Sequence, residues 1–291
     1  MKQSLLATGI NGLVGSKLTE IFKDKYSFDT LDISDPINPV DITDESSVIN
    51  ALKNSTAEFI VHFAAYTDVT GAWKQKGDKF GPAYKVNVNG TQNIVKACKN
   101  LGKHLIHIST AYVFNGEKQE LYTEADQLNP IEWYGQTKAE AETVITQSDI
   151  DWTILRIDQP FRSDNFVRPD AVRRIAHGLK NDSLYPQFTN HYFGPTFIDD
   201  FALVIDWAIR TKAKGIYNSS SGESWTDFDF ANLINSNFNF GKEVKKGDLD
   251  EYLKTLDRPY QRNTAMSVEK LKSEIDFALK SIKEGMKLVK L

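Results

Sequence analysis

Two side chains capable of proton transfer lie one helical turn apart in the segment Tyr134-Gly-Gln-Thr-Lys138. Residues at positions i and i+4 share one face of a helix, so the phenol and the ammonium are expected to meet. A nearby ammonium favours the phenolate, and we therefore expect Lys138 to lower the pKa of Tyr134. Thr110 directly follows the apolar run His104–Ser109, and its hydroxyl is placed to hold a substrate oxygen against Tyr134. Together these residues favour a site that moves a proton to or from a carbonyl or hydroxyl group.

A glycine-rich loop near the start of the chain is the second chemical signal. Gly9, Gly12 and Gly15 follow the apolar run Ser4–Thr8 and lead into a stretch of helical periodicity. Without a Cβ atom, such a loop lets backbone N–H groups approach a pyrophosphate at the positive N-terminal end of a helix. A glycine turn that binds nothing is the alternative, but the strand–loop–helix context favours a dinucleotide-binding loop.

An acidic residue stands where the second expected strand ends. Asp32 lies in the run Phe28–Ile33, about where a carboxylate bonds the ribose 2′-hydroxyl of NAD. No Arg or Lys lies between Ser27 and Lys53, so no cation nearby in the sequence is placed to accept the 2′-phosphate of NADP. The pattern favours NAD, with NADP as the second choice; a solvated turn aspartate is the alternative without a ligand.

The elements that must position these residues alternate regularly in the first half of the chain. Short apolar runs, each suited to a buried strand, are separated by stretches with apolar residues at helical spacing. The expected strands are Ser4–Thr8, Phe28–Ile33, Glu58–Phe63, His104–Ser109 and Trp152–Ile157. This alternation predicts the α/β class, with a Rossmann-type doubly wound parallel sheet covered by helices on both faces.

The second half has a looser pattern and predicts a smaller α/β substrate lobe. We expect a nucleotide-binding domain over 1–157 and a mainly substrate-binding lobe over 158–291, with 193–218 returning to the first domain. Polar, aromatic and proline-punctuated segments at 162–170 and 182–195 are typical of binding loops. Helices at 225–235, 250–256 and 268–277 are expected to form a small helical lobe, and a further helix is expected at 201–209 and a short strand at 215–218.

The composition argues against several classes of partner. The 291 residues are 41% hydrophobic and carry a net charge of −4 without a long basic block, so neither nucleic acid nor an anionic membrane surface is expected. No apolar run reaches the roughly 20 residues of a membrane span, and no signal-peptide pattern begins the chain. The single cysteine, Cys98, cannot form an internal disulfide, which favours a cytoplasmic location. The histidines at 62, 104 and 107 are expected to be core or edge residues rather than metal ligands, and no metal site is expected.

Taken in order, the motifs resemble those of the extended short-chain dehydrogenases/reductases, a superfamily of nucleotide-sugar epimerases, dehydratases and reductases. The segments VDITD at 40–44, HFAAYTDV at 62–69 and VNVNGTQN at 86–93 carry the resemblance further. It implies that Thr110, Tyr134 and Lys138 are catalytic, that Lys138 also bonds the nicotinamide ribose, and that Asn87 is structural. The residues that the resemblance assigns to the cofactor are Gly9, Asn11, Gly12, Leu13, Gly15, Asp32, Ile33, Asp41, Ile42, Phe63, Ala64, Ala65, Tyr66 and Lys138.

Within this superfamily the likeness is greatest to the dTDP-4-dehydrorhamnose reductases. The segments STAYVFNG at 109–116 and GPTFIDDFA at 194–202 have counterparts in that group. Two positions depart from it: Ala111 stands where the group has an acid that contacts the sugar, and Leu13-Val14 resembles the epimerase version of the loop. The residues expected at the substrate are Tyr112, Asn165 and Arg258. For Arg258, a contact with a substrate phosphate competes with a surface ion pair.

The expected function is an NAD(P)-dependent oxidoreductase acting on a nucleotide-activated sugar, with reduction of a 4-keto group as the first expectation. Epimerisation at C4 uses the same three catalytic residues and is the first alternative. A non-catalytic NAD(P)-binding regulatory subunit is the second, and the complete Thr–Tyr–Lys set argues against it. By analogy alone, the resemblance also implies a homodimer.

Overall fold

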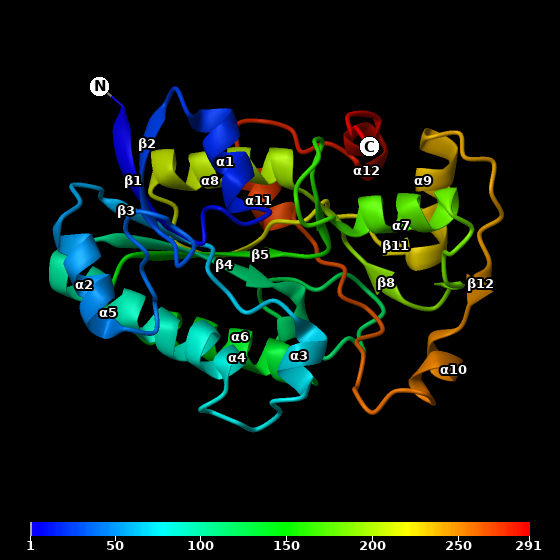
Figure 1. Ribbon diagram of the computed structural model, residues 1–291, viewed down its shortest axis with the longest axis horizontal. Helices are drawn as coiled ribbons and strands as arrows, with labels where there is room; N and C mark the ends of the chain where they lie inside the picture. Colours follow the sequence, from blue (N-terminus) through cyan, green and yellow to red (C-terminus); the bar gives the residue numbers. More distant parts are fainter. Residues whose placement is uncertain (1) are drawn as a thin grey trace.

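A parallel sheet of six strands, in the order β10-β5-β4-β3-β1-β2, forms the centre of the computed structural model, which describes residues 2–291 (Figure 1). Its strands are β1 (Gln3–Thr8), β2 (Tyr26–Leu31), β3 (Phe59–His62), β4 (His104–Thr110), β5 (Trp152–Ile157) and β10 (Gly215–Asn218). All neighbouring strands pair in parallel. The expected fold class is confirmed, and the expected strands overlap all six.

Helices cover both faces of the sheet, as Figure 1 shows. One face carries α1 (Gly15–Phe22) and α8 (Ile198–Thr211), and the other carries α2 (Glu45–Lys53), α5 (Thr91–Leu101) and α6 (Trp133–Thr146). Because side chains alternate along a strand, Leu5 of β1 joins the apolar core on the α8 side, while Leu6 joins the core on the α2 and α5 side. The central strands are thus buried on both faces, which explains their near-continuous apolar sequences.

The strand order creates a crevice at the carboxyl ends of β1 and β3. Since β1 lies between β2 and β3, the chain turns to one side of β1 after α1 and to the other side after α2. The loop after β3 continues into the short helix α3 (Val69–Trp73). In open parallel sheets, ligands bind at the point where the connections diverge in this way.

A π-helical turn divides the helical stretch that follows α3. The helix α4 (Pro82–Tyr84) leads into the π-helical turn η1 (Lys85–Gly90), which continues as α5. Within η1, the Asn87 side-chain oxygen accepts a hydrogen bond from the Tyr66 N–H at 2.8 Å, and its amide nitrogen donates to the Thr137 hydroxyl at 2.9 Å. Asn87 therefore joins the loop after β3 to α6, and π turns are frequent at functional sites.

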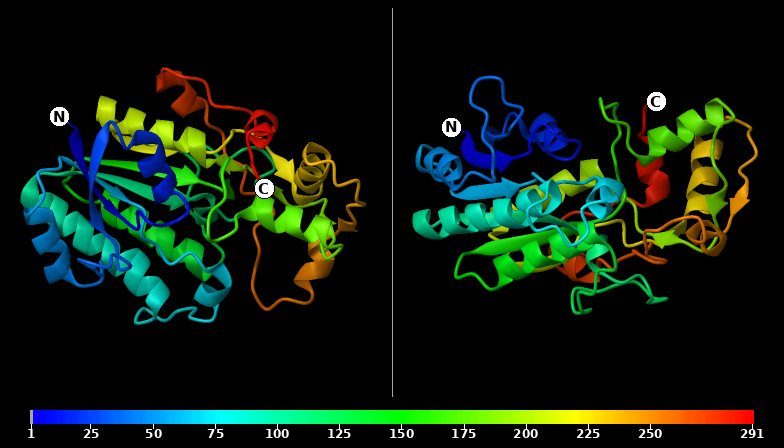
Figure 2. Two further views of the ribbon diagram at one scale, coloured as in Figure 1. Left: turned by 45° about the horizontal axis from the view of Figure 1, so that its top comes forward. Right: turned by 60° about the horizontal axis from the view of Figure 1, so that its bottom comes forward.

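A smaller lobe lies beside the carboxyl ends of the strands (Figure 2). Its apolar core includes Phe161, Phe193 and Phe230. The elements of the lobe are β6 (Pro160–Phe161), α7 (Ala171–Lys180), β7 (Gln187–Phe188), β8 (Tyr192–Phe193), β9 (Thr196–Phe197), β11 (Trp225–Thr226), α9 (Asp227–Asn237), β12 (Lys246–Gly247), α10 (Leu249–Leu253) and α12 (Ile282–Lys287). Only loops are expected at 182–195, yet β7 and β8 lie there, because strands of two residues leave no periodic pattern in a sequence.

Parts of the second half pack on the sheet domain. β10 extends the sheet beside β5, and α8 packs on α1. The expectation that 268–277 belongs to the lobe is wrong: α11 (Glu269–Glu274) contacts β10, and its Leu271 lies in the core of the sheet domain. Apolar spacing shows that a helix has a buried face, but it does not show which core receives that face.

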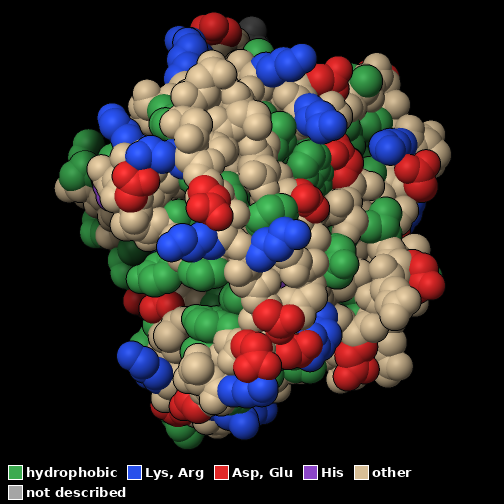
Figure 3. All heavy atoms as spheres, turned by 90° about the vertical axis from the view of Figure 1, so that its right-hand side faces the viewer, with side chains coloured by type: hydrophobic (Ala, Val, Ile, Leu, Met, Phe, Trp, Pro, Cys, Tyr) green, Lys and Arg blue, Asp and Glu red, His purple; other side chains and the backbone are tan. Residues whose placement is uncertain are grey.

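The outer face of the lobe has mixed charge. Basic and acidic side chains are interspersed over this face (Figure 3). Within residues 2–291, no helix combines the length and the apolar character needed to cross a bilayer. The same residues contain no group of three or more His, Cys, Asp or Glu side chains arranged to hold a metal ion.

Candidate active site

A cleft of about 910 Å³ lies between the carboxyl ends of the strands and the lobe. Its walls come from the loops after β1 to β5, from α6, and from the lobe segments at 166–174 and 258–260. The cleft is large enough for a cofactor-sized ligand. All the residues that the sequence assigns to catalysis or to the cofactor line it. Of the three assigned to the substrate, Tyr112 and Arg258 line the cleft and Asn165 does not.

The glycine loop is tightly packed against its neighbours. Gly9 has a φ of +62°, and a Cβ atom there would lie 2.7 Å from the Ala64 Cα in the loop after β3. Only glycine adopts this conformation without strain and leaves room for that contact. The N–H groups of Leu13 and Val14, at the start of α1, have no acceptor within the described part of the chain. Free N–H groups at a helix N-terminus are suited to binding an anion.

The cleft wall after β2 carries the carboxylate expected at the cofactor ribose. Asp32 accepts hydrogen bonds from the Asn11 N–H at 3.2 Å and from the Ser34 N–H at 2.9 Å. Ile33, next along the chain, is 69% exposed, whereas Ile42 is buried. This end of the cleft is therefore open to solvent, and the fixed carboxylate of Asp32 lies among apolar lining residues such as Ile42.

Glu132 fixes the start of α6 and with it the position of Tyr134. Its carboxylate accepts hydrogen bonds from the N–H groups of Tyr134, at 2.8 Å, and Gly135, at 2.5 Å. Glu132 is fully buried, and this burial raises its pKa to about 7. A Cβ atom at Gly135 would collide with the carbonyl oxygen of Tyr112, in the 3₁₀ turn η2 (Ala111–Val113) after β4. The lack of a side chain at this position lets α6 approach the end of β4 closely.

Lys138 is held by β4 rather than by Tyr134. Its ammonium donates a hydrogen bond to the Ile108 carbonyl at 2.8 Å and lies 3.1 Å from His107 Nε2. Burial lowers the Lys138 pKa to about 8. His107 is buried beside His62, with 5.1 Å between the ring centroids, and burial lowers the pKa of both. A neutral His107 therefore serves as an acceptor that orients the lysine.

The protonation of Tyr134 differs from the expectation. Burial raises its pKa, the charge of Glu132 raises it further, and a hydrogen bond with Thr110 opposes these effects. Lys138 does not lower the Tyr134 pKa in this arrangement, in which its ammonium donates to the Ile108 carbonyl and has no hydrogen bond with the phenol within residues 2–291. The expectation that Lys138 lowers the Tyr134 pKa is therefore wrong for this arrangement, in which the phenol stays protonated near neutral pH.

Of the residues expected at the substrate, Arg258 lies on the lobe side of the cleft, whereas the expectation for Asn165 is wrong. The Arg258 guanidinium lies 5.0 Å from the centroid of the Tyr260 ring, and its one hydrogen bond within residues 2–291 is a long contact of 3.4 Å to the Pro259 carbonyl. Asn165 is exposed, and its side-chain oxygen accepts from Arg173 Nε at 2.9 Å outside the cleft. Ala111 is buried in an apolar cluster and does not line the cleft.

Four charged residues of the cleft are missing from the sequence-based assignment: Asp158, Arg168, Asp170 and Arg174. Asp158 directly follows β5, and strand carboxyl ends are where ligands bind in this fold, so its position is a usable signal. Its carboxylate accepts from the Gly194 N–H at 3.0 Å and the Thr264 hydroxyl at 2.6 Å, while burial raises its pKa to about 6. Arg168 lies in the loop between β6 and α7, and Arg174 lies in α7. Neither follows an expected strand, so the sequence gives no signal that places them at the cleft.

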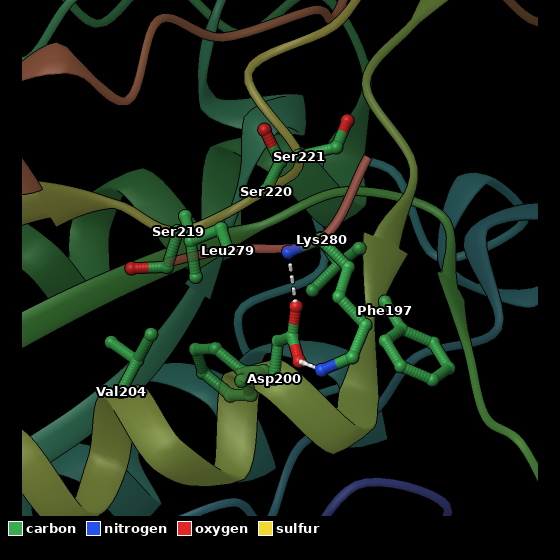
Figure 4. Close-up of a pocket in the computed structure, with 10 residues that line it drawn as sticks. Phe197, Asp200, Val204, Ser219, Ser220, Ser221, Leu279 and Lys280 are labelled. Carbon is green, nitrogen blue, oxygen red and sulfur yellow. Dashed lines mark hydrogen bonds and ion pairs between the residues drawn. The ribbon is translucent and has the colours of Figure 1, made fainter. Parts of the chain in front are cut away.

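A second cavity, of about 10 Å³, is a structural feature (Figure 4). Such a volume holds at most one water molecule. Lys280 donates to Asp200 at 2.7 Å inside it, and Ser219, Ser220 and Ser221 lie nearby. The two charges already bind each other, so this cavity has neither the room nor the free groups of a ligand site.

Comparison with known proteins places this geometry in a family. The family model described as the RmlD substrate binding domain matches residues 1–290. The dTDP-4-dehydrorhamnose reductase of Aggregatibacter actinomycetemcomitans is 31% identical over 238 residues, which cover 78% of this chain and 77% of the relative.

Solved structures share the fold of this protein over nearly its whole chain. The dTDP-4-dehydrorhamnose reductase from Bacillus anthracis str. Ames, in complex with NADP, superposes with a TM-score of 0.89 at 26% identity and covers 99% of this chain and 98% of its own. A UDP-glucose 4-epimerase from Thermus thermophilus, in complex with NAD, shares the fold at 20% identity, with a TM-score of 0.81 and coverage of 99% and 97%. The match along the whole chain, together with the named relatives, shows that this protein belongs to the RmlD substrate binding domain family.

Proposed function

We propose that this protein reduces the 4-keto group of a nucleotide-activated sugar with NAD(P)H, as a dTDP-4-dehydrorhamnose reductase does. The observation that carries the proposal is the convergence of Thr110, Tyr134 and Lys138 with the glycine loop in one cleft. Membership of the family and the relatives named dTDP-4-dehydrorhamnose reductase support it.

The residues of the cleft fit a dinucleotide. The free N–H groups of Leu13 and Val14 would hold its pyrophosphate, Asp32 its adenosine ribose and Lys138 its nicotinamide ribose. When bound, the reduced nicotinamide supplies the hydride. The NADP named with the Bacillus anthracis relative supports a dinucleotide of this kind, and Asp32 favours the form without a 2′-phosphate, NADH.

Tyr134 is the proton donor in this proposal. Its raised pKa keeps the phenol protonated, which is the form needed to give a proton to a carbonyl oxygen as that oxygen gains charge. Thr110, whose hydroxyl acts to lower the Tyr134 pKa and which lines the same cleft, would hold the same oxygen in line. On the lobe side, Arg258 has no carboxylate partner within residues 2–291 and is suited to a phosphate of the nucleotide sugar.

The test is turnover of dTDP-4-dehydrorhamnose by the purified protein, followed as loss of reduced-nicotinamide absorbance with NADH or NADPH. Tyr134→Phe removes only the phenolic hydroxyl and is expected to lower kcat by about 10²- to 10⁴-fold, the usual contribution of a general acid. Tyr84→Phe is the matched control, because Tyr84 is also buried and its hydroxyl bonds Glu140 outside the cleft. Undiminished turnover by Tyr134→Phe would rule out the mechanism.

Two other functions use the same cleft and give different results in this assay. A C4 epimerase would interconvert UDP- or dTDP-hexoses with bound NAD and no net oxidation of the cofactor; the raised Tyr134 pKa favours reduction. A regulatory subunit would bind the dinucleotide without turnover and copurify with a stoichiometric partner.

We also propose a cytoplasmic homodimer, by analogy with the family, and light scattering by the purified protein decides between one and two chains.

A further inference from the structure

The loop between β6 and α7 lies against the start of α1, beside the glycine loop. Arg162 in this loop donates hydrogen bonds to the Leu13 carbonyl at 3.1 Å and to the Ser16 hydroxyl at 2.7 Å. The buried ammonium of Lys17, in α1, forms an ion pair with Asp164. These contacts fix the first part of the loop at the dinucleotide end of the cleft.

Arg168 extends from the same loop toward the opposite wall of the crevice. Its Nη1 atom lies 3.5 Å from the Thr67 hydroxyl, at the long end of the hydrogen-bond range. Thr67 belongs to the loop after β3, the loop that packs on Gly9 through Ala64. Arg168 therefore reaches across the place where the connections after β1 and β3 diverge.

The guanidinium of Arg168 is exposed, lines the cleft and lacks a negative partner. Within residues 2–291 it has no carboxylate at ion-pair distance, and the contact with Thr67 is its one hydrogen bond. The nearest acid along the chain, Asp170, is bonded to Arg173 at 2.6 Å. An arginine in this state is suited to a bidentate contact with a phosphate group.

We propose that Arg168 binds the pyrophosphate of the dinucleotide from the side opposite the glycine loop. This inference rests on the proposed function, which provides the dinucleotide. The cofactor is favoured over the diphosphate of a nucleotide sugar because the loop is anchored on α1 and Arg168 contacts Thr67, both in the walls of the dinucleotide crevice. Arg258, in contrast, lies beside Tyr260 on the lobe side.

The test compares ligand binding by calorimetry in the full-length wild-type protein and in Arg168→Gln. The ligands are NADH, ADP-ribose, which keeps the pyrophosphate without the nicotinamide, and dTDP, which has only the diphosphate of a substrate. Because Arg168→Gln loses one charge-assisted contact, we expect it to bind NADH and ADP-ribose about tenfold more weakly than the wild type and to bind dTDP with unchanged affinity. Arg262→Gln is the matched control, because Arg262 is an exposed arginine paired with Asp250 outside the cleft.

Salt dependence separates a direct contact from a structural role. A phosphate contact makes NADH binding weaker as salt rises, so Arg168→Gln is expected to show a shallower salt dependence than the wild type and Arg262→Gln. Arg168→Lys keeps the charge but loses the fork of two donors, and is expected to retain the salt dependence with intermediate affinity.

Each outcome decides the inference. NADH binding by Arg168→Gln within about twofold of the wild type, with an unchanged salt dependence, overturns it and leaves the proposed function standing. Weaker dTDP binding with unaffected NADH binding also overturns it, because the guanidinium would then serve the substrate. A wild-type protein that binds neither NADH nor NADPH contradicts the proposed function, and this inference with it.

Discussion

Lys138 carries its charge in a place where a charge is poorly solvated. The side chain is 2% exposed, and within residues 2–291 its ammonium has only the Ile108 carbonyl and the neutral His107 ring as partners. Glu142 favours the charge, but its carboxylate is bonded to Arg156 at 2.6 Å. Burial therefore dominates and leaves the Lys138 pKa at about 8.

An alkaline limit to activity follows from this pKa. Because the folded protein lowers the pKa of Lys138, the ammonium is present below about pH 8 and is lost as the pH rises through that value. The quotient kcat/KM is expected to fall about tenfold per pH unit above this limit if the charge is required. Lys138→Arg stays charged and is expected to shift any residual activity to higher pH. A flat profile up to about pH 10 would contradict this role.

The other groups around Lys138 do not produce the same limit. His62 and His107 are already neutral near pH 7, since burial lowers the pKa of both. Burial raises the pKa of Glu132 to about 7 and that of Asp158 to about 6, so both carboxyl groups change charge below the pH of the Lys138 limit. Tyr134 loses its proton at higher pH than Lys138, because its pKa is raised.

At the residue scale, the sequence predicts which residues form the candidate site better than it predicts their hydrogen bonds and protonation. Tyr134, Lys138 and Thr110 are recognisable from type and spacing, and all three line the cleft. The bond from Lys138 to the Ile108 carbonyl and the burial that keeps Tyr134 protonated both depend on the distance between α6 and β4. Sequence spacing within one helix carries no information about that distance.

The glycine loop shows how one element sets the position of another. Gly9→Ala is expected to lower the free energy of unfolding by about 2 to 4 kcal/mol and to weaken NADH binding, because the new Cβ would lie 2.7 Å from the Ala64 backbone at a φ of +62°. Gly241→Ala is the control: its φ is +64°, but a Cβ there meets nothing within 4 Å. In this control the free energy of unfolding is expected to fall by only about 1 kcal/mol, because only the backbone conformation opposes the new side chain.

Urea unfolding and calorimetric NADH binding measure the two effects. Equal losses of stability in Gly9→Ala and Gly241→Ala would show that the contact with Ala64 relaxes without cost. Unchanged NADH affinity in Gly9→Ala would show that the packing of this loop does not control the binding of the dinucleotide.

At the element scale, long periodic segments are predictable and short or irregular ones are not. The strands β1 to β5 and the helix α8 follow from apolar runs and helical spacing. The π turn η1 depends on contacts with distant residues, such as the hydrogen bond between Asn87 and the loop after β3. The short strands β7 and β12 likewise depend on pairing with each other across the lobe. Propensity also cannot assign α11 to the sheet core, since Leu271 would fill either core equally well.

At the scale of the whole molecule, an ion network joins the lobe to the sheet domain. Asp164 of the lobe loop pairs with the buried Lys17 of α1 and, at 2.7 Å, with Arg162. Burial acts to raise the Asp164 pKa, but these two cations outweigh it and hold the pKa well below its usual range. The carboxylate therefore contributes stability above its usual pKa of 3.8, and the contribution is lost as the pH falls below that value.

Asp164→Asn is expected to lower the free energy of unfolding by about 1 kcal/mol at pH 7, a modest value because the side chain is 35% exposed. The difference from the wild type is expected to narrow below about pH 4, as the carboxylate is neutralised in the unfolded chain and then in the folded protein. Asp182→Asn is the control, because its pair with Lys242 is 72% exposed on the Asp side and is expected to contribute less than about 0.5 kcal/mol. Urea unfolding at pH 7 and below about pH 4 measures the free-energy difference between each variant and the wild type. A difference for Asp164→Asn that stays constant with pH would contradict the stabilising role of the Asp164 carboxylate.

The position of β10 at the edge of the sheet has a consequence for synthesis of the chain. β10 pairs with β5, yet β6 to β9, α7 and α8 separate the two strands in the sequence. While the chain emerges from the ribosome, β5 is complete long before its partner, and its backbone N–H and C=O groups form an open edge in the meantime. We therefore expect a nascent chain paused between the two strands to be prone to pairing with another copy until residues 158–218 have followed.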